Sequence, residues 1–174
     1  MTAPLALTLA ICDMPSGNRA YTLDATPDEL GAISADLGLI ACRDLHAAYA
    51  IRALGGGRYK LTGSLAAHVT QACVVTLEPV ENALKIPLDV TFSPTPAEAA
   101  PASEDDEIEV FSLPDIEPIE NGQLAVGRVI FEALAAGIDP YPRAGGATFA
   151  WDDPRASDSL VHPFAGLAKL KLKE

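Results

Sequence analysis

Large apolar side chains alternate with smaller or polar ones in several stretches of this chain. The first stretch is residues 4–11, where Leu5, Leu7, Leu9 and Ile11 occupy every second position. A period of two places these side chains on one face of an extended strand. We therefore expect the first strand of the protein over residues 4–11.

Two further alternating runs flank a glycine triplet. The runs cover residues 44–54 and 59–67, and the triplet at 55–57 permits the backbone conformations of a tight turn, which predicts a β-hairpin. The triplet lacks the Lys-Ser/Thr ending of a phosphate-binding loop, so we expect no nucleotide site there. We expect residues 69–77 to continue the second of these runs as extended chain, up to Glu78-Pro79. A fourth run, residues 84–92, contains Pro87, which predicts an edge position or a bulge for that strand.

Three segments instead have the spacing of a helix. Thr26 followed by Glu29 forms a capping box, and the apolar positions after it recur at helical spacing until Gly38. Residues 123–136 are apolar on more than one face, which indicates a helix packed into the core. Residues 163–172 predict a short closing helix.

This order of strands and helices predicts a single α+β domain over residues 1–174. We expect a curved antiparallel sheet with two or three packed helices, and closure of the sheet into a barrel is an open alternative. A Pro-rich acidic segment at about 94–107 has no large apolar residue with which to pack, which predicts a mobile loop. A second flexible segment is expected at about 144–160.

Acidic residues are concentrated in one stretch of the chain. The net charge is −12, from 24 acidic and 12 basic residues. Nine of the acids lie between Pro94 and Glu120, where there is no Lys or Arg, and the rest of the chain carries −3. Such a charge disfavours a general electrostatic grip on nucleic acid, because Lys and Arg supply most of that binding.

The cysteines and the first residues of the chain indicate the cellular compartment of the protein. Cys12, Cys42 and Cys73 are odd in number and far apart, which argues against a disulfide framework. The first residues have no Lys or Arg before their apolar run, so we expect no signal peptide. No run approaches the roughly 18 apolar residues of a membrane helix. The sequence therefore predicts a cytoplasmic protein.

The sequence offers little for catalysis. There is no Gly-x-Ser-x-Gly motif, and His46, His68 and His162 each lack a second ligand three or four residues away. Cys73 has Thr76 where a zinc knuckle would have its next cysteine, so we expect Cys73 to be buried as a small apolar residue. We predict a protein that is not an enzyme, without catalytic residues, cofactor or metal.

Three segments of the chain have a recognisable order and spacing. They are residues 63–80, where Cys73 leads into Leu-Glu-Pro-Val, residues 115–122 before the second helix, and residues 137–143 with the tail at 163–171. From about residue 45 onward the chain resembles the YceD family, the large-ribosomal-RNA-subunit accumulation proteins of bacteria and chloroplasts. The resemblance implies a role in the accumulation of large-subunit ribosomal RNA and in ribosome assembly, without a known reaction.

The chain departs from this family at its cysteines. Many members have Cys-x-x-Cys in the first segment and a further Cys after the helix, whereas this chain has Thr76 at one position and Tyr141-Pro142 at the other. We therefore infer no metal site in this chain from the resemblance. The positions that match the family motifs are Cys73, Glu78, Pro79 and Pro140.

The resemblance implies that ribosomal RNA or a pre-ribosomal particle is the partner. Basic and aromatic residues outside the acidic stretch are the candidates for this contact: Arg52, Arg58, Lys60, Tyr141, Arg143, Lys169 and Lys171. An alternative is an acidic adaptor or chaperone that binds a basic ribosomal protein. Its partner-binding residues would be Glu104, Asp105, Asp106 and Glu107. No membrane or small-molecule substrate is expected.

Overall fold

The first helix begins at the predicted capping box. In the computed structural model, which describes residues 4–14, 17–94 and 115–150, the Glu29 N–H donates to Thr26 Oγ1 at 3.4 Å. The Glu29 carboxylate accepts from the Thr26 N–H at 2.8 Å. These two bonds satisfy donors that the helix itself leaves free, so the predicted helix start is confirmed.

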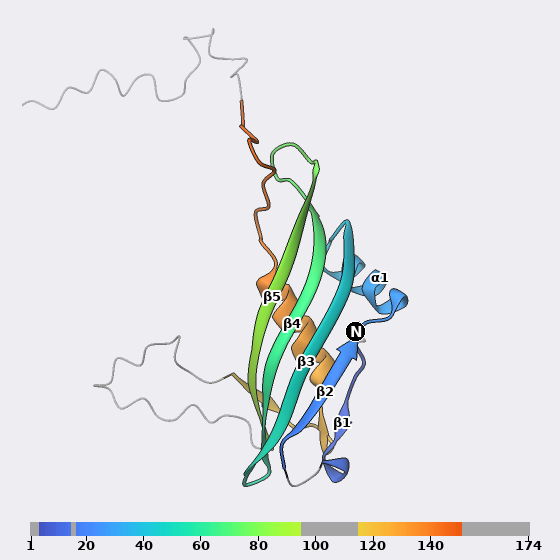
Figure 1. Cartoon of the computed structure of the whole chain (residues 1–174), viewed down its shortest axis with the longest axis vertical. Helices are drawn as coiled ribbons and strands as arrows, with labels where there is room; N and C mark the ends of the chain where they lie inside the picture. The colour runs from blue at the N-terminus through green and yellow to red at the C-terminus, as the bar shows by residue number, and fades with distance from the viewer. Residues whose placement is uncertain (1–3, 15–16, 95–114, 151–174) are drawn as a thin grey trace, which may run out of the picture. The chain divides into compact units, whose positions relative to one another are not determined.

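The described residues form two α-helices, one 3-10 helix and seven strands (Figure 1). In chain order they are β1 (Leu9–Ala10), η1 (Ile11–Asp13), β2 (Arg19–Asp24), α1 (Pro27–Asp36), β3 (Ala41–Gly55), β4 (Arg58–Ala72), β5 (Pro79–Ser93), β6 (Ile116–Pro118), β7 (Gln123–Leu124) and α2 (Val126–Gly137).

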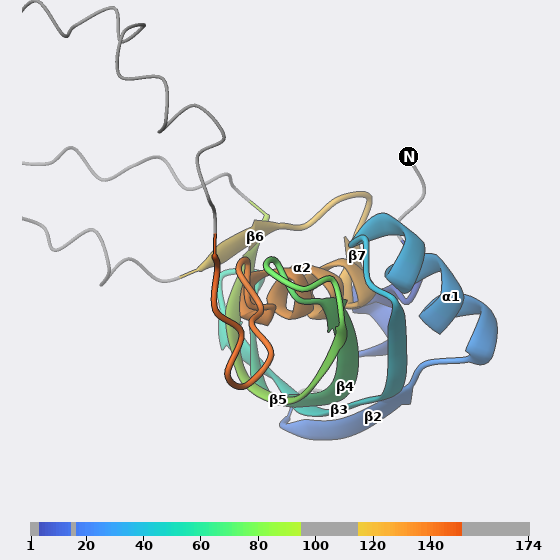
Figure 2. The ribbon, with the colours of Figure 1, turned by 90° about the horizontal axis from the view of Figure 1, so that it is seen from above.

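The main sheet has the strand order β2-β3-β4-β5-β6. The first four strands are antiparallel neighbours, and β6 pairs with β5 in parallel at three positions only. Strands β1 and β7 form a separate antiparallel pair. Figure 2 shows the main sheet curving around α2. The predicted single α+β domain with a curved sheet is confirmed, and the sheet stays open instead of closing into a barrel.

The predicted hairpin joins β3 to β4. Gly55, Gly56 and Gly57 have φ values of 86°, 60° and 73°, a region that residues with a side chain seldom adopt. Pro87 lies opposite Ser64 of β4 and outside the three positions at which β6 pairs with β5. Within the described chain its missing N–H therefore costs no ladder hydrogen bond on the far side. Strand β5 is not the last strand of the sheet, but its outer edge is unpaired at Pro87, which is what the predicted edge position requires.

The core lies between the concave face of the sheet and α2. The sheet contributes alternate residues of β3, β4 and β5, and α2 contributes residues on several sides, as its apolar sequence predicts. Phe92, Leu61 and Ile130 are among the fully buried side chains. Cys73 is also fully buried, so its predicted burial is confirmed, but its sulfur accepts from three backbone N–H groups and does not pack as a purely apolar residue.

Three predicted boundaries were wrong. Over residues 4–11 only Leu9–Ala10 form a strand, because the preceding segment runs beside the start of α2, where Leu7 C=O accepts from the Gly127 N–H. The second helix begins three residues later than predicted, since Gln123–Leu124 pair with β1. The extended chain expected up to Leu77 ends at Ala72 and turns at residues 74–76.

Some predictions fall outside the described residues. These are residues 95–107 of the acidic loop, residues 151–160 of the second flexible segment and the helix at 163–172. The compact unit that holds all the described helices and strands ends at Ala144. Residues 145–150 are a separate piece, with a turn at Gly145–Gly146 and irregular chain after it.

Candidate binding surfaces

The convex side of the sheet is one candidate surface, which we call the outer face. Figure 2 shows no described helix on this side, since α2 lies in the concavity. Side chains alternate between the two faces of a strand, so the register defines the outer face. Its residues on β2–β5 are Ala20, Thr22, Asp24, Arg43, His46, Ala48, Ala50, Arg52, Lys60, Thr62, Ser64, Ala66, His68, Thr70, Glu81, Ala83, Lys85, Pro87, Asp89 and Thr91.

Basic residues gather on this outer face. The structure describes eight Lys and Arg residues, of which four lie on the face and a fifth, Arg58, lies at the adjoining hairpin. Arg52 and Lys60 are direct cross-strand neighbours. The positive charge of the described chain is thus concentrated on the sheet surface that no described helix covers.

Four acids on or beside the outer face form ion pairs there. Asp24 pairs with His46 at 2.6 Å, Asp89 pairs with Lys60, and two further pairs join Asp44 to His68 and Glu81 to Arg43. Among the described residues no acid pairs with Arg52, Arg58 or Lys85. Arg52, Arg58 and Lys85 are therefore the cations of this surface that no described acid neutralises, and they are the most available to an external anion.

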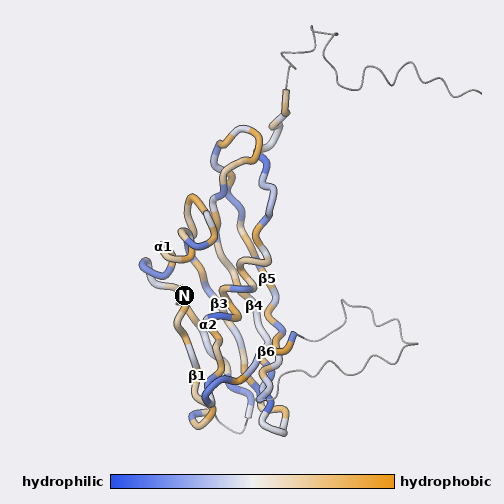
Figure 3. The backbone as a smooth tube through the Cα atoms, turned by 180° about the vertical axis from the view of Figure 1, so that it is seen from behind, coloured by the Kyte–Doolittle hydropathy of each residue, from blue (hydrophilic) through white to orange (hydrophobic). Residues whose placement is uncertain are grey.

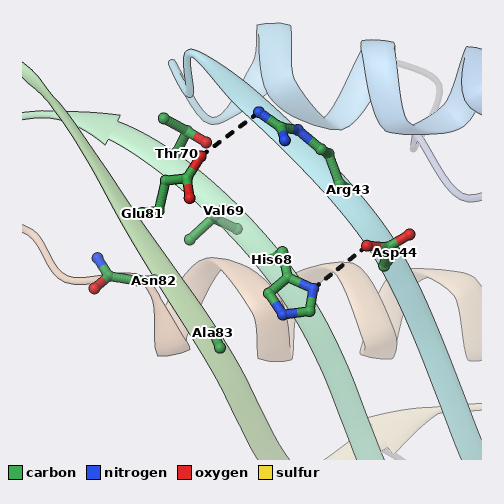
Figure 4. Close-up of a pocket in the computed structure, with 8 residues that line it drawn as sticks. All are labelled: Arg43, Asp44, His68, Val69, Thr70, Glu81, Asn82 and Ala83. Carbon is green, nitrogen blue, oxygen red and sulfur yellow. Dashed lines mark ion pairs between the residues drawn. The ribbon is translucent and has the colours of Figure 1, made fainter.

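A polar depression of about 370 Å³ lies at one end of the outer face (Figure 4). Figure 4 shows Arg43 and Asp44 of β3, His68 of β4 and Glu81 of β5 around it. The Arg43–Glu81 and His68–Asp44 pairs, at 3.8 Å and 3.5 Å, join exposed side chains of different strands that line it. Both acidic and basic side chains line the depression. Among the residues that the structure describes, no group of three or more His, Cys, Asp or Glu is arranged to hold a metal.

A β-bulge shapes this depression. The register between β3 and β4 shifts between Arg43 and His46, and Asp44 within the shift has φ 52°. A bulge adds one unpaired residue to a strand and redirects its side chain. Asp44 therefore points across to His68, a contact that the spacing of the two residues along the chain does not suggest.

A second candidate surface surrounds Cys73, and we call it the sulfur junction (residues 71–78 and 139–144). Two hydrogen bonds join its two segments: the Val74 N–H donates to Pro142 C=O at 2.9 Å, and the Gln71 side-chain amide donates to Asp139 C=O at 2.8 Å. The Cys73 N–H donates to Glu78 C=O at 2.8 Å, which closes the turn. The junction thus ties the β4–β5 turn to the chain that follows α2.

Three backbone donors surround the sulfur of Cys73. The N–H groups of Ala144, Val75 and Thr76 lie 3.3, 3.4 and 3.4 Å from Sγ. Hydrogen bonds to a charged group favour its charged form. These hydrogen bonds lower the pKa of the Cys73 thiol to about 6, although burial acts in the opposite direction. The bond from Ala144 has the largest effect, and Thr76 and Val75 add to it. Cys42 lacks such donors, and burial raises its pKa.

The pKa of Cys73 gives a first testable prediction. The ordinary thiol pKa is 9.0 and the folded value is about 6, so the thiolate stabilises the fold fully above the ordinary pKa. This stabilisation is lost as the pH falls through 6. We expect the thiolate ultraviolet absorbance that Cys73→Ser removes to titrate with a midpoint near 6.

Cys12→Ser is the control for this titration, because Cys12 is exposed and outside the junction. The unfolding free energy of the parent protein should also fall relative to that of Cys73→Ser between pH 9 and pH 6. A midpoint near the ordinary thiol value would show that the three N–H donors do not hold a thiolate.

The sulfur junction also exposes apolar side chains. Leu77 and Tyr141 are 77% and 73% exposed, and Leu77 has φ 63°, a strained conformation for a residue with a side chain. Figure 3 shows the hydrophobic colour of the β4–β5 turn at one end of the sheet. The Tyr141 N–H donates to Asp139 Oδ1 at 2.9 Å, which fixes the backbone that carries the aromatic ring.

The structure divides the predicted site residues into two groups. Arg52, Arg58 and Lys60 lie together at the hairpin end of the sheet. Tyr141 and Arg143 lie at the opposite end, beyond the far end of the 15-residue strand β4. At roughly 3.3 Å per residue, β4 separates the two groups by about 45 Å. Lys169, Lys171 and residues 104–107 are outside the described residues.

The four positions on which the proposed resemblance rests lie in the sulfur junction or directly beside it. Glu78 and Pro79 follow Cys73 in the turn, and Pro140 belongs to the loop that supplies the Ala144 donor. The sequence predicted these positions from a resemblance alone. Cys73 and Glu78 are joined by a backbone hydrogen bond in the junction, Pro79 begins β5 directly after it, and Pro140 lies in its second segment.

Other residues of the two surfaces were missed. Arg43, Asp44 and Glu81 were not among the predicted site residues, and His68 was taken to be isolated. The β-branched and small residues around them indicated strands, but neither strand register nor a bulge can be read from spacing. Lys85 was missed for the same reason.

Neither described helix is long and apolar enough to cross a membrane. No protein-family model, curated protein or solved structure matches this chain.

Proposed function

We propose that this chain is a non-enzymatic factor that binds RNA of the large ribosomal subunit, or a pre-ribosomal particle, and supports ribosome assembly. The proposal starts from the resemblance to the YceD family in residues 63–80, 115–122 and 137–143. It places the protein in the bacterial cytoplasm, where the three unpaired cysteines would stay reduced.

The distribution of charge on the outer face carries the RNA part of this proposal. The protein as a whole has a net charge of −12, yet five of its eight described Lys and Arg residues lie on this face or at its hairpin. Phosphate contacts need cations that can approach the backbone of the nucleic acid. Arg52, Arg58 and Lys85 meet this need, because they are exposed and no described acid pairs with them.

The shape of the outer face agrees with this contact. Small side chains occupy its centre, among them Ala48, Ala50 and Ala66, so the cations at its border can reach an extended strand laid across the sheet. The residues that define the outer face include no Phe, Tyr or Trp on which a base could stack. We therefore expect binding through phosphates, with strong salt dependence and weak sequence preference.

Neutralising the unpaired cations tests the proposal. We expect Arg52→Ser, Arg58→Ser and Lys85→Ser together to weaken binding to single-stranded fragments of large-subunit RNA. The slope of log K against log salt should fall by about 2, since each lost phosphate contact removes about 0.7. Fluorescence anisotropy across a salt series measures both quantities.

Arg19→Ser is the matched control, because Arg19 is exposed but belongs to the opposite side of the sheet, over the Tyr21 ring. Equal RNA binding by the triple variant and the control would contradict the RNA role of the outer face. The same series should include purified basic ribosomal proteins, for which the adaptor alternative predicts binding that is lost when residues 104–107 are changed to Ser.

One observation favours that second function. A groove beside β5 is rimmed by four acids, Asp89, Asp115, Glu117 and Glu132. Asp115 and Glu117 belong to the described end of the acidic stretch at 94–120, whereas Asp89 lies on β5 and Glu132 on α2. A protein that binds a basic partner could use such a groove in place of residues 104–107, or together with them.

A further inference from the structure

The strand β5 has a long free edge. It pairs with β4 along its whole length, but with β6 only at Thr91, Phe92 and Ser93. Within the described chain no other backbone hydrogen bond reaches the opposite edge between Pro79 and Val90. An unpaired edge of this length is a template for an added strand.

Alternation along β5 defines which backbone groups face this edge. The Thr91 N–H donates to Asp115 C=O and Ser93 C=O accepts from the Ile119 N–H, so odd-numbered residues face the β6 side. The β4–β5 register runs without a shift, and the alternation therefore continues upstream. The backbone groups of Glu81, Ala83, Lys85 and Asp89 thus face the free edge, and Pro87 contributes its carbonyl alone.

A groove of about 390 Å³ lies directly beside this edge. One wall consists of residues 87–90 of β5, and the opposite wall of Val129, Glu132, Ala133 and Ala136 of α2. The four α2 residues follow the i, i+3, i+4, i+7 spacing of one helix face. A strand paired with β5 would place every second side chain in this groove, against Val129, Ala133 and Ala136.

The charges of the groove select the occupant. Its four acids face only two described cations: Lys60 pairs with Asp89, and Arg128 pairs with Glu117 and lies 3.8 Å from Glu132. Asp115 has no ion-pair partner within the described residues. A segment with Lys or Arg beside small apolar residues therefore complements both the rim and the walls.

Two other occupants fit less well. A second copy of this chain carries a net charge of −12 as well, and Pro87 and Lys85 on the edge oppose pairing of two identical strands. Residues 95–114 of the same chain contain no Lys or Arg and would bring more negative charge to the groove. Residues 167–173 of the same chain alternate Lys with apolar residues, so their sequence also complements the rim. We assign the groove to a different, basic protein, and a full chain with Lys169, Lys171 and Lys173 changed to Ser should then bind a basic probe peptide no more tightly than the parent. Tighter binding by that variant would assign the groove to the chain's own segment.

We propose that the free edge of β5 and the adjoining groove bind an extended basic segment of a partner protein by β-strand addition. The inference rests on the second proposed function, whose partner class it sharpens, and it is independent of RNA binding. Backbone hydrogen bonds to β5 supply affinity, the α2 wall selects small apolar side chains, and the acidic rim selects flanking Lys or Arg.

A fluorescein-labelled peptide, Lys-Val-Lys-Val-Lys-Val-Lys, is the probe for this proposal. We expect saturable binding to the full chain, measured by anisotropy at physiological salt. Ala136→Trp, which fills the groove, should weaken binding at least about tenfold. Ala135→Trp should leave binding unchanged, because Ala135 is exposed on the same helix and does not line the groove.

Two N-methylated peptides test the hydrogen bonds on the unaltered protein. One carries N-methyl groups on its valines and the other on its lysines, so each loses the N–H groups of one edge only. Strand addition requires that one peptide lose binding and the other keep it. Equal binding of the two peptides, equal effects of the two Trp variants or the absence of saturable binding would overturn the proposal.

RNA binding separates this proposal from the first proposed function. Ala136→Trp should bind RNA as the parent does. The double variant Arg52→Ser, Arg58→Ser, which leaves Lys85 on the β5 edge unchanged, should bind the peptide as the parent does. Peptide binding that survives while RNA fails to bind would refute the RNA function alone. A melting curve by circular dichroism checks that both Trp variants are folded.

Discussion

Phe92→Ala is expected to lower the free energy of unfolding by about 3–5 kcal/mol, the range for removal of a fully buried aromatic side chain. Phe92 is 0% exposed and belongs to the part of β5 that pairs with β4 on one side and β6 on the other. The variant loses the transfer free energy of the ring and leaves a cavity where three strands meet. Urea unfolding followed by circular dichroism measures the change.

Tyr141→Ala is the control for that measurement. Its ring is 73% exposed, so we expect a change of less than about 0.5 kcal/mol. Because small domains have a total stability of about 5–15 kcal/mol, Phe92→Ala should move the urea midpoint far more than the control does. A loss below 1 kcal/mol would mean that Phe92 does not occupy the centre of the core.

Gly127→Ala should destabilise the protein by roughly 1–3 kcal/mol, although alanine is the better helix former. A Cβ atom at Gly127 would overlap the Leu5 carbonyl oxygen and lie 2.8 Å from the Leu7 nitrogen. The chain before β1 would have to move away from α2. That movement would break the 2.8 Å hydrogen bond from the Gly127 N–H to Leu7 C=O.

Gly31→Ala provides a matched comparison in α1. A Cβ atom there meets nothing within 4 Å, so we expect helix propensity alone to act and to stabilise the protein by about 0.5–1 kcal/mol. Thermal unfolding of the two variants tests both expectations, a lower melting temperature for Gly127→Ala and a higher one for Gly31→Ala. If Gly127→Ala were also stabilising, the close packing of residues 5–7 on α2 would be refuted.

The central β3–β4 hairpin shows which parts of the fold can be predicted from local sequence signals. Residues 44–54 and 59–67 alternate and flank three glycines, and both strands form there, each a few residues longer than predicted. In contrast, β2 was not predicted, because only Tyr21 and Leu23 mark its alternation. A strand with so few large apolar residues forms because β3 supplies its hydrogen-bonding partner.

The candidate surfaces depended still more on tertiary contacts. Cys73 was predicted to be buried, but its thiolate character comes from the N–H of Ala144, 71 residues further along the chain. Likewise, Asp44 faces His68 only because a bulge and a strand register bring them together. Spacing along the chain contains no information on contacts of this kind.

The amino-acid sequence by itself determined the α+β class, the central hairpin, the capped first helix and the apolar second helix. Each of these follows from short-range physics, namely side-chain periodicity, turn stereochemistry and capping hydrogen bonds. Only the tertiary structure decided the open sheet, the cluster of cations on its outer face, the sulfur junction and the free edge of β5 beside an acidic groove. These features depend on which distant segments share backbone hydrogen bonds, and many registers satisfy the same local pattern until the whole core is packed.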